Sequence, residues 1–223
     1  MISFNNIIVS VGTTSIFFSF IFSIAIVKAK NNRGYMKYFF LCPLIAILIS
    51  ANTILNNFYS LYTKPIYFSL QNSLALLDLV FWLIFFSHVI NNKSDSSKLR
   101  IIFFVTFSIV LFSSLYNPLD KPNLHLVSLF NICKTLFCLY FYHNLFRKDP
   151  EQKIKSEPSF WVITGLFFYS SLSIPFYALN GYLRSRFPLI IWVNLFAISN
   201  IMIIIMHFFF IKAYICTIRM PKA

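Results

Sequence analysis

Long apolar stretches separated by short polar connections run through almost the whole chain. A helix needs about 20 mainly apolar residues to cross a bilayer, and inside lipid only a helix or a closed barrel satisfies its own backbone. Seven stretches are candidates for such helices: 7–27, 38–58, 65–90, 101–116, 124–146, 158–180 and 187–214. The pattern therefore predicts an all-α fold, a polytopic membrane bundle of seven transmembrane helices in a single domain.

Two of these stretches carry further local signals. The range 101–116 is the shortest and least polar, so we expect it at the periphery of the bundle, facing lipid. The range 158–180 begins with Pro158, which suits the first turn of a helix, and contains Pro175, where we expect a kink.

Composition supports a membrane protein. The chain has 223 residues, of which 58% are hydrophobic, and it contains 29 Phe. We expect most of the Phe side chains to face lipid. Because the spans use nearly all of the chain, no room is left for a soluble catalytic domain.

The basic residues indicate an orientation. Of the 19 Lys and Arg residues, Lys134 lies within a span, and four lie on one side of the predicted membrane: Lys64, Lys121, Arg184 and Arg186. The other fourteen lie on the opposite side, which the positive-inside rule assigns to the cytoplasm. This predicts an inner-membrane, multi-pass protein with its N-terminus outside and its C-terminus in the cytoplasm.

Asp78 and Lys134 are the two charges that lie deep in the predicted membrane. A charge at the bilayer centre costs about 3 kcal/mol on insertion scales, so such residues usually face a partner, a cavity or the bundle interior. Both helices should run in the same direction, and the rise of a helix brings the two residues to similar depth. We therefore expect them to share a polar core, as a structural ion pair or as part of a functional site.

Six Asn residues complete the predicted polar core: Asn52, Asn56, Asn72, Asn131, Asn194 and Asn200. They could line a ligand pocket, but Asn in membrane spans commonly bonds neighbouring helices together, and we favour that interpretation. The histidines near the helix ends have no acidic residues in the same layer. We therefore expect no metal site, no cofactor and no catalytic activity.

Two motifs in the last third of the chain carry a resemblance. They run from Glu157-Pro158-Ser159-Phe160-Trp161 through Phe168-Tyr169-Ser170, and from Ser199-Asn200-Ile201 through Phe210-Ile211-Lys212-Ala213. Here the chain resembles small stand-alone seven-helix membrane proteins of Bacteroidetes-type bacteria, which are similar to seven-helix sensor modules of signalling proteins. The resemblance implies a seven-helix sensor but assigns no site residue. By size and hydrophobicity the chain is also similar to small membrane accessory proteins of CRISPR or other phage-defence operons.

Together these features favour a receptor-like or signal-transducing membrane protein. The alternatives are a transporter or oligomeric pore, and a membrane accessory protein of a phage-defence operon. The expected partners are the lipid bilayer, a cytoplasmic protein that contacts the basic loops, and further copies of the chain in a homo-oligomer. Basic clusters that flank apolar spans suit lipid headgroups, so we expect no specific nucleic-acid binding.

Overall fold

The structure is a computed structural model, and it describes residues 13–24, 36, 39–59, 64–90, 101, 105, 108, 124–147, 154, 157–186 and 188–219. All of the regular secondary structure in these residues is helical, which confirms the all-α class. Six helices contain most of them: Thr13–Ile24, α2 (Leu41–Tyr59), α3 (Lys64–Val89), α5 (Leu124–Arg147), α6 (Pro158–Arg186) and α7 (Leu189–Arg219).

Three stretches within these helices are long and apolar enough to cross a membrane. They are Ser69–Val89 in α3, Pro158–Leu179 in α6 and Ile198–Ile218 in α7. This agrees with a membrane protein. The predicted fourth span, 101–116, lies outside the described residues except for Ile101, Val105 and Ser108, which are helical and exposed.

The helix bounds differ most from the prediction in the last two helices. Both α3 and α5 begin and end within one residue of the predicted ranges. However, α6 continues from the predicted end at 180 to Arg186, and α7 continues from 214 to Arg219. The length of the apolar run predicts only the part of a helix that lies in the hydrocarbon core of the membrane. The helix itself can continue beyond that core into the polar region. As expected, α6 begins at Pro158.

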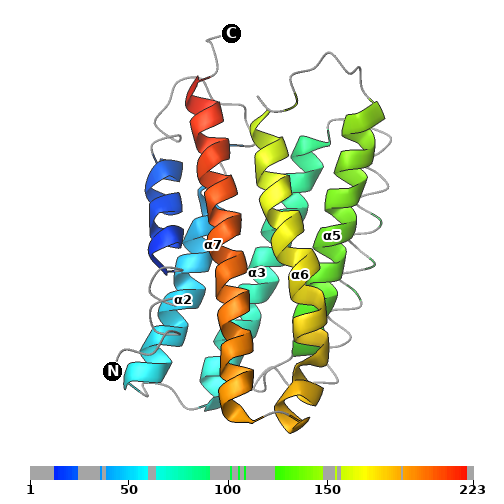
Figure 1. Cartoon of the computed structure of the whole chain (residues 1–223). Coiled ribbons are helices and arrows are strands. Elements are labelled where there is room, and N and C mark those ends of the chain that lie inside the picture. The colour runs from blue at the N-terminus through cyan, green and yellow to red at the C-terminus, as the bar shows by residue number, and fades with distance from the viewer. Residues whose placement is uncertain are drawn as a thin grey trace.

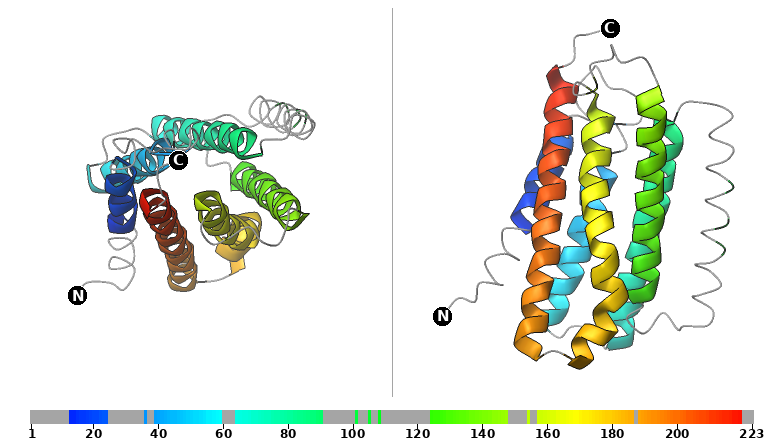
Figure 2. Two further views of the ribbon diagram at one scale, coloured as in Figure 1. Left: turned by 90° about the horizontal axis from the view of Figure 1, so that it is seen from above. Right: turned by 45° about the vertical axis from the view of Figure 1, so that its right-hand side comes forward.

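The helices stand side by side in a closed ring, as Figure 2 shows in the view from above. Around the ring the order is Thr13–Ile24, α2, α3, α5, α6 and α7. The most extensive packing is between α6 and α7 and between α5 and α6, while α2 packs on α3. The colours of Figure 1 show that α3, α5 and α7 run in one direction and that α2 and α6 run in the other. The expected parallel arrangement of α3 and α5 is therefore present.

The core of the bundle is aromatic. Phe39, just before α2, lies with its ring centroid 5.1 Å from that of Phe210, 5.5 Å from that of Tyr214 and 6.1 Å from that of Trp82. Among the described Phe side chains, more are buried than exposed. The remaining described Phe side chains are partly exposed, so the expectation that most Phe faces lipid stays a prediction. Lipid tails and a protein core are equally apolar, so a Phe-rich sequence suits either environment.

Candidate functional site

Asp78 and Lys134 are in direct contact across the α3–α5 seam. Each lies near the middle of its helix, and the two helices run in the same direction. The ammonium Nζ of Lys134 donates to Asp78 Oδ2 at 2.5 Å. Such a charge-assisted bond is short and is stronger than a bond between neutral groups. The two residues that were expected to meet from their similar depth are therefore in contact.

Trp82 donates a second hydrogen bond to the carboxylate of Asp78. One helical turn after Asp78, its indole Nε1 donates to Asp78 Oδ1 at 3.0 Å. Each carboxylate oxygen thus accepts one hydrogen bond, one from a cation and one from a neutral donor. Trp82 was not among the residues predicted for the polar core, although its spacing of four residues from the acid was a usable signal. A buried indole N–H usually finds an acceptor, and residues i and i+4 of a helix are neighbours.

The ion pair is largely hidden from the surroundings of the bundle. The side chain of Lys134 is 7% exposed and that of Asp78 is 23% exposed. Trp82 is 2% exposed and belongs to the aromatic core. Burial removes the hydration of both charges, and their mutual attraction offsets much of that free-energy cost. Removal of either partner therefore leaves the other charge uncompensated.

Asn131 lies one turn before Lys134 on α5 and is 2% exposed. Its Nδ2 makes no hydrogen bond within the described part of the chain. Thr135, which follows Lys134, donates to the Asn131 carbonyl oxygen at 2.8 Å. Its Oγ1 is also hydrogen-bonded to Ser170 Oγ on α6 at 2.9 Å. Of the six Asn residues predicted for the polar core, Asn131 lies nearest in sequence to the charge pair, three residues before Lys134.

Asn52 bonds two helices together. Its Nδ2 donates to Gln71 Oε1 at 3.1 Å, which links α2 to α3. This is the structural role favoured for the Asn residues. Asn72, next to Gln71, is buried, and Asn200 on α7 is partly buried.

The remaining two predicted Asn residues lie where the structure does not describe side chains. Asn56 is in α2 and Asn194 is in α7, and only their helical backbone is described. The assignment of these two residues to a polar core stays a prediction.

His207 is the most unusual histidine. It is completely buried on α7, edge-on to Phe210 with ring centroids 5.3 Å apart. Neither ring nitrogen has a hydrogen-bond partner among the described residues. Those residues also contain no group of three or more His, Cys, Asp or Glu side chains that could hold a metal ion. Among the described residues, the Asp78–Lys134 ion pair is therefore the best candidate for a functional site.

Comparison of the chain with protein-family models, with curated proteins and with solved structures finds no match. The argument for function therefore rests on the site itself. In that site two opposite charges on separate helices are in contact, and the acid also accepts a hydrogen bond from an indole.

Proposed function

We propose that this protein is a multi-pass inner-membrane receptor-like protein that transduces a signal without catalytic activity, with the Asp78–Lys134 pair as a latch between two groups of helices. The observation that carries the proposal is this buried ion pair at the α3–α5 seam. Removal of one partner of a buried pair leaves the other charge uncompensated, so a signal that disturbs the pair would favour a second arrangement of the helices.

The helices on either side of the seam are held to their other neighbours by side-chain hydrogen bonds. Thr135 pairs with Ser170, and Tyr142 donates to Thr164 Oγ1 at 2.8 Å, so α5 is fastened to α6. On the other side, the Asn52–Gln71 bond fastens α2 to α3.

The seam itself has a smaller interface than α5–α6 or α6–α7. The ion pair and the contact of Phe86 with Phe137, with ring centroids 5.4 Å apart, cross it. Between α2–α3 and α5–α7, however, this seam is the most extensive helix contact in the described part of the chain, so a change at the charge pair would act on the junction of the two groups.

In this proposal the bundle has seven spans, an outside N-terminus and basic connections that contact a cytoplasmic partner. The support is the unequal distribution of Lys and Arg in the sequence, together with the helix directions, which reverse from α2 to α3 and along α5, α6 and α7 and are the same for α3 and α5. A homo-oligomer is compatible with the same arrangement, because every described helix has apolar residues on its outer surface.

A distance measurement across the seam tests the latch. Spin labels replace the exposed residues Leu77 on α3 and Leu136 on α5, in protein whose native Cys residues are replaced and which is held in lipid nanodiscs. We expect one distance population in the parent and a second population in Asp78→Asn. Asn52→Leu, which removes the α2–α3 bond, is the matched control and should keep the parent distance.

Two outcomes would oppose the proposal. An unchanged α3–α5 distance in Asp78→Asn would show that the ion pair is not a latch. Saturable flux of a small solute into liposomes that contain the purified protein would favour the transporter alternative over a receptor.

A further inference from the structure

Helices α6 and α7 touch closely at one level and separate at another. At Gly165 an added Cβ would lie 2.8 Å from Phe209 Cβ and 3.0 Å from the Met206 carbonyl oxygen, so the two backbones are in contact there. About three turns further along α6, near Pro175, a cavity of about 240 Å³ lies between the helices. The close contact at Gly165 thus gives way to an open space.

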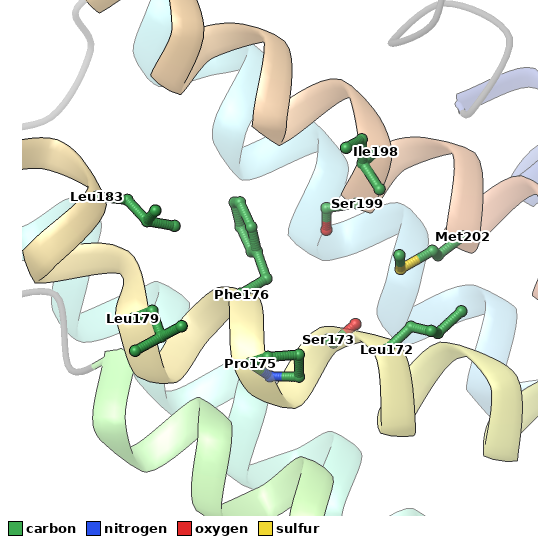
Figure 3. A pocket seen from close by; sticks show the side chains of 9 residues that line it. All are labelled: Leu172, Ser173, Pro175, Phe176, Leu179, Leu183, Ile198, Ser199 and Met202. Carbon is green, nitrogen blue, oxygen red and sulfur yellow. The ribbon is translucent and has the colours of Figure 1, made fainter. Parts of the chain in front are cut away.

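The walls of this cavity are hydrocarbon except for two hydroxyl groups. Figure 3 shows Ser173 on α6 and Ser199 on α7 with their oxygen atoms directed into the space between the two helices. Both residues are buried, Ser173 at 1% and Ser199 at 6% exposure. The apolar wall includes Leu172, Phe176 and Met202.

Ser173 lacks the bond that a helical serine usually makes. Ser171, two residues earlier, donates to the Phe167 carbonyl oxygen at 2.7 Å, which is the usual bond back along the helix. Ser173 Oγ, in contrast, has no hydrogen-bond partner within 3.5 Å among the described residues, and the Tyr169 hydroxyl one turn earlier interacts with it only at longer range. A buried hydroxyl without a partner is unfavourable, so a partner from inside the cavity would be stabilising.

Size and charge restrict what could supply that partner. The cavity is larger than the ~150 Å³ site that holds benzene in an engineered protein and smaller than the ~300 Å³ at which pockets for drug-sized ligands begin. None of its lining residues is charged, so a charged ligand would be buried without compensation. The occupant should therefore be small and neutral, with one hydrogen-bonding group.

The route into the cavity leads from the outer surface of the bundle. Leu172, Leu179 and Ile198 line the cavity and are also exposed, each at about half of its surface. In a membrane protein, exposed leucine and isoleucine on spanning helices face lipid tails. A ligand dissolved in the bilayer could therefore enter sideways between α6 and α7.

We infer that the α6–α7 cavity binds a small neutral amphiphile from the bilayer, with an apolar body of about eight carbons and one hydroxyl or carbonyl group that bonds Ser173 and Ser199. That such binding changes the state of the latch rests on the proposed function. The connection is through α6, since Ser128 on α5 donates to the Ile174 carbonyl oxygen at 3.4 Å, next to Pro175. A ligand bound at this level would favour one position of α6 relative to α5, which carries Lys134.

A second space of about 420 Å³, between α2 and α3, lacks the feature that carries this inference. It is lined by apolar side chains and His88. The ring nitrogen Nδ1 of His88 already donates to the Ile84 carbonyl oxygen at 2.8 Å. No partnerless hydroxyl among the described residues marks that groove, so nothing there specifies a ligand.

Photolabelling tests the inference directly. The probe is an eight-carbon alcohol that carries a diazirine, added to the full-length protein in phosphatidylcholine nanodiscs, and the labelled residues are located by peptide mass mapping. We expect label on residues 172–183 and 198–202, with saturable competition by unlabelled 1-octanol. Octane, which has the same body without the hydroxyl, should compete at least fivefold more weakly, because one hydrogen bond changes affinity by about that factor.

Three variants give the test its specificity. Ser199→Leu fills the cavity and should reduce labelling there at least threefold. The double change Ser173→Ala with Ser199→Ala keeps the cavity and should remove the preference for octanol over octane. Ser171→Ala is the matched control, because that hydroxyl does not line the cavity, and it should keep both properties.

Unsaturable label spread over all lipid-facing residues would overturn the inference. So would equal competition by octanol and octane in the parent, or loss of the octanol preference in Ser171→Ala. If Ser199→Leu fails to fold, the double alanine variant still decides the matter. Binding and the α3–α5 distance are separate measurements, so failure of the ligand site is distinguishable from failure of the latch.

Discussion

At the scale of single residues, the molecule is organised around a carboxylate that accepts bonds from a lysine and a tryptophan. Both donors are more than nine-tenths buried, so the mutual attraction of the pair is offset by lost hydration and its net contribution to stability should be small. The buried His207 differs, because no described group offers its ring nitrogens a hydrogen bond. The two sites predict opposite responses to replacement by an uncharged or apolar side chain.

Removal of one charge should be more harmful than removal of both. We expect Asp78→Asn and Lys134→Met each to lower the free energy of unfolding, by up to about 3 to 5 kcal/mol, because the remaining charge is buried without its partner. The double variant should recover most of this loss. Thermal unfolding in detergent, read as a double-mutant cycle, measures the coupling.

The cycle also separates a structural pair from a functional one. If the pair acts as a latch, the double variant should be stable and yet show the second α3–α5 distance population. Additive losses in the double variant would mean that the two charges do not interact, and would remove Lys134 from the candidate site.

Replacement of His207 by leucine should leave the protein as stable or make it more stable. The imidazole is fully buried without a described hydrogen-bond partner, and a buried polar group of this kind costs about 1 to 3 kcal/mol. Leucine is similar in size and has no polar atom to desolvate. A fall in melting temperature for His207→Leu beyond that for the neighbouring exposed change Phe208→Leu would show that His207 has a partner that stabilises the fold.

At the scale of helices, α6 is the element that connects the candidate sites. It is bonded to α5 through Ser170 and Thr164, and it lies against α7 at Gly165. Its Pro175 was expected from the sequence to mark a kink, and the residue lies inside the helix, at the cavity. The close contact at Gly165 has no counterpart in the sequence analysis.

Gly165→Val should separate α6 from α7. The added Cβ would already lie 2.8 Å from Phe209 Cβ, and overpacking of this kind typically costs about 1 to 3 kcal/mol. Ala178→Val is the matched control, because Ala178 is exposed on the same helix and pays only the difference in helix propensity, less than about 0.7 kcal/mol. Thermal unfolding of both variants under identical conditions provides the comparison, and equal melting temperatures would contradict the tight contact.

At the scale of the whole molecule, the described helices form a ring around an aromatic centre (Figure 2). Directions alternate between α2 and α3 and between α5, α6 and α7, while α3 and α5 are parallel. The predicted fourth span would connect the two parallel helices, but it lies largely outside the described residues. The number of spans and their orientation are therefore matters for a labelling experiment.

Cysteine accessibility tests the seven-span orientation. In protein without native Cys, a membrane-impermeant reagent added outside should modify cysteines introduced at Thr63, Asp120 and Ser185. The same reagent should not modify cysteines introduced at Asn32, Ser96 and Gln152. The reason is the unequal distribution of Lys and Arg between the two sets of connections. Modification of Ser96→Cys from outside would contradict the model of seven spans.

The sequence by itself determined the properties that vary along a helix axis. The helical class and the approximate limits of α3 and α5 follow from apolar length, and the meeting of Asp78 with Lys134 follows from depth and the cost of a lone buried charge. These quantities depend on the rise per residue and on residue type, both of which can be read directly from the chain.

Only the tertiary structure decided how each helix is rotated about its axis. That rotation places Trp82 against the carboxylate, turns many Phe side chains inward, brings Gly165 onto Phe209 and directs the hydroxyls of Ser173 and Ser199 into one cavity. In water, the boundary between polar and apolar faces would reveal the rotation. In a bilayer, lipid tails are as apolar as the core, so hydrophobicity is similar all round the helix and only contacts with neighbouring helices select the buried face.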